Sequence, residues 1–141
     1  MNEESPRGHV AQEVRALLRE RIESFEHLEA LLLLHKHRDR PWAPQDVAER
    51  LNIQTPEVEA VLHHLRRNSL VDVRSEGEAA LFIYRPEDPD LSNAVERLSR
   101  DYEDSRVEIM RLMSKNTIER LRTQTLRLFA DAFVLGRKKD G

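Results

Sequence analysis

The spacing of prolines in the middle of the chain limits which folds this sequence can adopt. Pro41 and Pro44 follow one predicted helical segment and end it. Pro56 lies farther along the chain, at the position where a later helix can begin. Proline is excluded from helix interiors, suits the first helical turn, and disfavours helical backbone in the residue before it. The sequence therefore predicts a helix of about two turns between Pro44 and Pro56, with a longer helix on each side.

The first of these longer helices has a clear start and end. Ser24 is a predicted N-cap, and the run after it is apolar on a wide face until about His37. Because the two prolines follow, we expect extended backbone through Trp42 and then a short helix over 45–51. The width of the apolar face predicts that the first helix is buried on most sides.

A third helix and a hairpin complete the central segment. Thr55 is predicted to cap the helix over 55–68, and the runs LVDVR and ALFIYR predict two strands joined by a short turn at Gly77. Trp42, the only tryptophan, is expected to lie in the core under this hairpin. An effector pocket near Trp42 is the alternative.

Helices are also predicted on both sides of this segment. Val10 to Glu20 has apolar residues at helical spacing, and the helix could continue into the next one. A long helix is expected from about Asp90 to Leu112, where apolar spacings of four and three alternate and Ser105 is the only exception. Such alternation is typical of a helix that packs along another helix.

A last helix is predicted to follow this long one. Asn116 and Glu119 match a capping box, and Gly136 is a candidate C-cap before a basic tail. The chain thus divides into an N-terminal helix or arm (1–21), a central segment (22–86) and a C-terminal helical region (87–141).

The composition narrows the class of protein. The chain has 141 residues and no cysteine, which excludes disulfides, thiolate zinc sites and a cysteine nucleophile. The N-terminus is acidic without an apolar signal, and the longest apolar run is too short to cross a bilayer. We expect a cytoplasmic protein that does not bind membranes, with neither an enzymatic activity nor a cofactor.

The central segment carries the strongest functional signal. The run PQDVAERLNIQTPEVEAVLHHLRRNSLVDV places apolar residues at core positions of a helix-turn-helix, and Ala48 is small where two helices would cross closely. Residues 22–86 resemble the winged-helix transcriptional regulators of the MarR, PadR and ArsR type. Ser69 departs from the glycine usual in those families, and Asn68 is expected to adopt the left-handed backbone instead.

The resemblance implies a mainly α fold with a small β-hairpin wing and C-terminal dimerisation helices. It also implies a transcriptional regulator that binds double-stranded DNA, with the helix 55–68 in the major groove and the hairpin 70–85 as the wing. The outward face of that helix and the basic residues nearby give the candidate DNA-binding set. This set is Thr55, Glu59, Ala60, His63, Arg66, Arg67, Arg74 and Arg85.

The C-terminal helices are predicted to join two copies into a homodimer. The candidate dimerisation residues are Leu91, Val95, Leu98, Tyr102, Ile109, Leu112, Leu121, Leu128, Phe129 and Phe133. Acidic residues predominate over 88–104 and basic residues over 106–127, so antiparallel pairing of two copies would bring opposite charges together.

The charge of the central segment argues against DNA binding. The chain has a formal net charge of −3, and the whole excess of acids lies in residues 22–86. Glu76 and Glu78 flank the turn, where a DNA-binding wing usually carries cations. The alternative function is therefore a winged-helix module that binds another protein. A third hypothesis is a small-molecule sensor with a pocket between the dimer helices and the wing.

Adjacent and alternate histidines do not predict a metal site. His35 and His37, like His63 and His64, lack the i, i+4 spacing that would put two ligands on one face of a helix.

Overall fold

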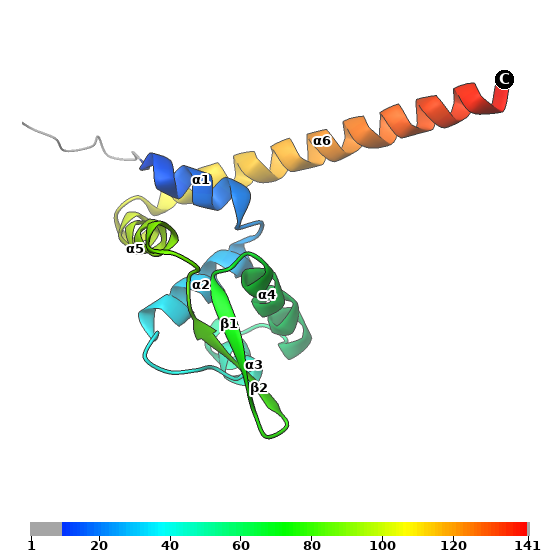
Figure 1. Cartoon of the computed structure of the whole chain (residues 1–141). Coiled ribbons are helices and arrows are strands. Elements are labelled where there is room, and N and C mark those ends of the chain that lie inside the picture. The colour runs from blue at the N-terminus through cyan, green and yellow to red at the C-terminus, as the bar shows by residue number, and fades with distance from the viewer. Residues whose placement is uncertain (1–9, 141) are drawn as a thin grey trace, which may run out of the picture.

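The computed structural model describes residues 10–140, and side chains up to residue 134. The part of the expected N-terminal arm before residue 10 lies outside the described residues. Figure 1 shows a body of short helices and a hairpin, from which one long helix extends. The elements in order are α1 (Gln12–Glu20), α2 (Phe25–Lys36), α3 (Pro44–Leu51), α4 (Thr55–Arg67), β1 (Val71–Glu76), β2 (Ala79–Tyr84), α5 (Pro89–Asp104) and α6 (Arg106–Asp140). The fold is mainly helical with a small β-hairpin, as the sequence predicts.

The start of α2 confirms the predicted cap. The Ser24 side chain accepts a hydrogen bond of 3.1 Å from the backbone N–H of His27. The helix α1 ends at Glu20, so it does not continue into α2. Five of the twelve residues of α2 are buried, which agrees with the wide apolar face of its sequence.

The chain after α2 has the predicted extended backbone. Trp42 and Phe82 exchange two backbone hydrogen bonds of 2.7 Å, so Trp42 adds a short third strand segment beside β2. The side chain of Trp42 is only 1% exposed, which confirms its place in the core under the hairpin. Pro44 then occupies the first turn of α3, where its missing N–H leaves no bond unmade.

The hairpin has a two-residue turn. β1 and β2 pair antiparallel from Val71 with Tyr84 to Glu76 with Ala79, leaving Gly77 and Glu78 between them. Gly77 has φ 62°, a backbone conformation that favours glycine in such turns.

Two predictions at the ends of α4 are wrong. Thr55 is the first residue of α4 and not its cap, because the N-cap is Gln54, which makes no side-chain capping bond. The left-handed residue after α4 is Ser69, with φ 63°, whereas Asn68 has φ −95°. The Asn68 amide instead donates to the carbonyl of His64 at 2.9 Å, and this bond is compatible with its right-handed backbone.

The predicted helix boundaries in the C-terminal region are also wrong. The break falls at Ser105, with φ −135° and ψ 45°, and α6 then continues through Asn116 and Gly136 to Asp140. Asn116 begins no helix, because its neighbour Thr117 lies inside continuous helix and bonds through its hydroxyl to the carbonyl of Met113 at 3.0 Å. Glycine inside a helix costs only about 1 kcal/mol, so Gly136 does not by itself end one.

The core extends from the hairpin into the C-terminal helices. Apolar residues of all the helices and both strands contribute to one buried cluster, in which α1 packs against α5 and α6. Beside this cluster, Nε2 of His35 on α2 lies 3.0 Å from Oε1 of Glu96 on α5. That hydrogen bond lowers the pKa of Glu96. It also joins the central segment to α5. The division into three segments remains a prediction.

Candidate nucleic-acid interface

The helix α4 has one buried face and one exposed face. Its buried residues are Val58, Val61, Leu62, His64 and Leu65. Ala48 of α3 is buried too, which agrees with a close crossing of α3 and α4. The opposite face presents Glu59, Ala60, His63, Arg66 and Arg67 to solvent. A helix held by its apolar face beside a hairpin can place such an exposed face in a groove of DNA.

The exposed face of α4 brings together most of the predicted base-contacting residues. The ring of His63 contacts Phe82 of β2 edge-on, with ring centroids 5.3 Å apart. Arg67 forms no ion pair with any of the residues that the structure describes. Thr55 is partly exposed at the first turn of the helix. Through its contact with Phe82, His63 links this face to the hairpin.

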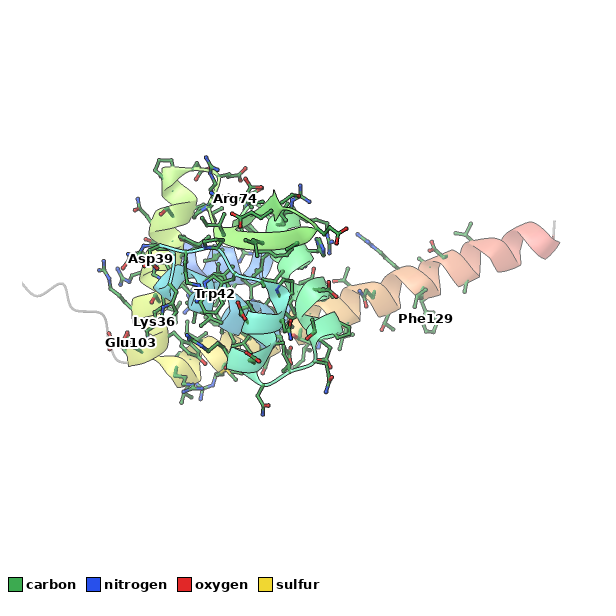
Figure 2. All side chains as sticks on the ribbon, turned by 90° about the horizontal axis from the view of Figure 1, so that it is seen from below. Lys36, Asp39, Trp42, Arg74, Glu103 and Phe129 are labelled. Carbon is green, nitrogen blue, oxygen red and sulfur yellow. The ribbon has the colours of Figure 1, made fainter. Side chains whose placement is uncertain are left out.

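The hairpin separates its charged residues from this face. Side chains alternate along a strand, so Asp72, Arg74 and Glu76 share one side of the hairpin, while Val73 and Phe82 share the other. The side with Phe82 is the one that contacts α4 through His63. Arg74 lies on the outer side, 4.0 Å from the carboxylate of Glu76. Figure 2 shows Arg74 and Trp42 on opposite sides of the hairpin.

Two other predicted cations lie together at the open end of the hairpin. Arg66 and Arg85 line one hollow of about 330 Å³, together with Ser69, Asp72 and Glu87. Nη1 of Arg85 lies 3.8 Å from Oδ2 of Asp72. Because Val71 and Tyr84 form the pair farthest from the turn, this hollow is remote from the wing tip. The structure thus divides the predicted phosphate-contacting residues between different parts of the surface.

The sequence did not single out the two arginines that lie closest to Trp42. The guanidinium carbon of Arg40 lies 3.7 Å from the centroid of the Trp42 ring, and that of Arg50 lies 5.2 Å from it. Both arginine side chains are exposed. The sequence signal that could have found them is a lone tryptophan with arginines at short spacing on both sides. However, Arg50 contacts the Trp42 ring only when α3 folds back on the preceding loop.

The predicted dimerisation residues separate into two groups. Leu91, Val95, Leu98 and Ile109 are buried in the core of the same chain, and Tyr102 and Leu112 are partly buried against it. Leu121, Leu128, Phe129 and Phe133 are more than half exposed. These last four lie on the part of α6 that extends beyond the body, where Figure 2 shows Phe129. An apolar repeat in the sequence does not distinguish these two situations.

Another hollow lies away from the hairpin. It measures about 550 Å³ between α2 and α5, and its lining includes Leu32, Leu33, Tyr102 and Glu103 but neither Trp42 nor any residue of the hairpin. The described residues include no group of three or more side chains that could hold a metal ion. In the same part of the chain, no helix is long and apolar enough to cross a membrane.

Comparisons with known proteins agree with this architecture. No protein-family model matches the chain, and no curated protein matches its sequence. Among solved structures, HlyU from Vibrio cholerae N16961 is similar, with a TM-score of 0.51 and 21% identity over 62% of this chain and 91% of that one. MepR, a transcription regulator from Staphylococcus aureus, has a TM-score of 0.50 and 15% identity over 85% of this chain and 90% of that one. At these identities the likeness concerns the fold, and the chain is a winged helix-turn-helix protein.

Proposed function

We propose that the chain is a homodimeric DNA-binding regulator of transcription, with α4 in the major groove and the hairpin as the wing. The exposed face of α4 is the observation that carries this proposal. Among the described residues Arg67 has no acidic ion-pair partner, and Ala60 and His63 lie on the same face, where they would meet base edges. MepR, which has this fold, is described as a transcription regulator. A cytoplasmic location and the absence of catalysis go with this function.

The remaining predicted residues are assigned base or phosphate contacts of different strength in this proposal. Glu59 would accept from a cytosine amine, and Thr55 would contact a phosphate at the start of α4. Arg66, Arg74 and Arg85 would contact phosphates that lie farther from the centre of α4. The carboxylates of Glu76 and Asp72 lie near Arg74 and Arg85 and partly neutralise their charge. We therefore assign these two arginines the weaker phosphate contacts.

The extended part of α6 is proposed as the dimer contact. All residues from 121 to 134 are exposed, and a free helix of that length is only marginally stable in water. At about 100° per residue, Leu121, Leu128 and Phe129 fall on one side of α6, together with Ile118 and Leu126. An exposed apolar stripe of this kind marks an interaction surface, and a second copy would cover it with an identical stripe.

The DNA-binding proposal is tested by fluorescence anisotropy on a random duplex. Binding is expected at about 50 mM salt and should weaken steeply as salt increases, because phosphate contacts release counterions. Replacing Arg67 by Ala should reduce the differences in affinity between duplexes of different sequence, measured in the same assay. Arg19→Ala changes an exposed arginine on α1 and should leave these differences unchanged. No binding at about 50 mM salt would refute this function.

The dimer is tested by light scattering after size-exclusion chromatography. The wild-type protein is expected to be a dimer, and Leu128→Asp with Phe129→Asp should make it a monomer. Thr123→Asp introduces one such charge on the other side of α6 and should leave the dimer intact. A monomeric wild-type protein, or a dimer in the double variant, would contradict the proposed contact.

The acidic outer side of the hairpin favours one alternative. Asp72 and Glu76 lie on that side, and Glu78 lies in the exposed turn. A winged-helix module with this surface would bind a basic protein instead of DNA. The anisotropy experiment distinguishes the two functions, since the module would not bind the duplex.

A further inference from the structure

We propose that Arg40 and Arg50, held against Trp42, bind backbone phosphates of the DNA beside α4. This inference rests on the proposed DNA-binding function and assigns its main phosphate contacts. It replaces none of the base-contacting residues. It adds a cationic surface, defined here as the Arg40–Trp42–Arg50 platform, that lies outside the helix-turn-helix face predicted from the sequence.

The platform has a rigid base. Trp42 is almost completely buried, and its backbone forms two hydrogen bonds of 2.7 Å with Phe82. The Trp42 indole N–H also donates to the carbonyl of His37 at 3.4 Å. An arginine placed on this ring therefore rests on a fixed surface, and less side-chain freedom is lost when it binds a ligand.

Arg40 is held on that base from two directions. Its guanidinium carbon is 3.7 Å from the ring centroid, within the range of a cation–π contact, and its Nε donates to the carbonyl of Pro41 at 3.2 Å. Stacking covers one face of the planar guanidinium and leaves N–H groups at its edge. These are the groups that bind phosphate oxygens.

A series of contacts links the platform to the exposed face of α4. The ring of His63 contacts Phe82, and Phe82 is paired with Trp42 through its backbone. Phe82 faces the α4 side of the hairpin, as its contact with His63 shows, whereas Arg74 faces the outer side. A duplex lying against α4 would thus meet the platform on the same side of the molecule.

The charges around the platform leave it cationic. Arg50 forms no ion pair within the described part of the chain, and Arg40 has only Asp46, with Nη2 to Oδ2 at 3.5 Å. Both partners of that pair are about half exposed, so the attraction between them is weak and a phosphate could displace the carboxylate. Phosphate carries the complementary charge for both arginines.

The test measures the affinity for random duplex as a function of salt in the full-length protein. Arg40→Ala with Arg50→Ala should weaken binding to all sequences alike. Each lost phosphate contact reduces the slope of log K against log salt by about 0.9, so the ratio of Kd at 200 mM to Kd at 50 mM should fall about tenfold. Arg19→Ala with Arg100→Ala removes the same charge from α1 and α5 and is the matched control.

Two further variants test the role of the ring and of Asp46. Arg40→Lys with Arg50→Lys keeps the charge without a planar group to stack, so binding should weaken while the slope is largely kept. Asp46→Asn removes the competing carboxylate and should tighten binding. Urea unfolding checks that each variant retains the wild-type stability.

The outcomes separate this inference from the proposed function. If the wild-type protein binds no duplex, the proposed function fails and the inference fails with it. If the wild-type protein binds and the double alanine variant behaves like the matched control, only the platform is refuted. If the double lysine variant binds as tightly as the wild-type protein, the role given to Trp42 is wrong.

Discussion

Acidification is expected to destabilise the protein through His27, at the junction between α2 and α4. The ring of His27 stacks on that of His64, with centroids 3.7 Å apart and planes inclined by 10°. Nδ1 of His27 accepts a hydrogen bond of 3.2 Å from the backbone N–H of Glu23, so this nitrogen must be unprotonated. Burial, followed by the neighbouring His64, lowers the pKa of His27 from 6.5 to about 4.

The sign of the effect follows from the protons that each state binds. Between pH 6.5 and about 4, the unfolded chain protonates His27 and the native state does not. The unfolded state therefore binds more protons in this window, and the free energy of unfolding falls as the pH falls. A shift of this size corresponds to at most about 3.4 kcal/mol, and because His27 is only half-buried we reduce this to about 1–2 kcal/mol.

The measurement is urea unfolding at fixed protein concentration between pH 7.5 and 4.5. Carboxylates also contribute to the fall in stability, so the informative quantity is the difference between the wild-type protein and His27→Gln. The variant should lose about 1–2 kcal/mol less over this range. His63→Gln, an exposed histidine on α4, should keep the wild-type dependence. An equal fall in stability for His27→Gln and the wild-type protein would refute the reasoning.

Two other predictions concern the C-terminal helices and the end of α4. Leu98→Ala should reduce the free energy of unfolding by about 2–5 kcal/mol, because Leu98 is fully buried, whereas Leu128→Ala should mainly weaken the dimer. Chemical unfolding measures the first effect and light scattering the second, and an unchanged stability of Leu98→Ala would contradict its burial. Ser69→Gly should increase the free energy of unfolding by up to about 1 kcal/mol, because Ser69 has φ 63°, a conformation that favours glycine. Gly77→Ala makes the reverse change at φ 62° and should lower the stability. Thermal unfolding measures both variants, and a less stable Ser69→Gly would contradict the prediction.

Local sequence signals were sufficient for most of the fold. Ser24, Pro44 and Gly77 each act through residues next to them in the chain, so their effects on a cap, a first turn and a hairpin could be predicted. Ser105 was noticed as the exception in an apolar repeat, yet it marks the break between α5 and α6. The capping box at Asn116 was misleading because the same residues are tolerated within a continuous helix.

The candidate site was less accessible to sequence reasoning. The repeat that includes Val95 and Leu98 predicts a helix that packs on another helix, but it carries no information on whether that helix belongs to the same chain. Most of the large apolar residues that are exposed lie on the part of α6 beyond the body. The contact of Arg50 with Trp42 likewise depends on tertiary structure, since it joins α3 to the preceding loop.

The position of charges, more than their sum, decides what the central segment can bind. Residues 22–86 carry the whole acidic excess of the chain, which by itself argues against DNA. However, Asp72 and Glu76 lie on the outer side of the hairpin, whereas Arg40 and Arg50 lie next to Trp42, which pairs with Phe82 beside α4. Because screening in salt limits charge interactions to about 10 Å, a phosphate beside the platform would respond mainly to the nearby arginines. The net charge of the segment alone therefore does not rule out the proposed DNA binding on its α4 side.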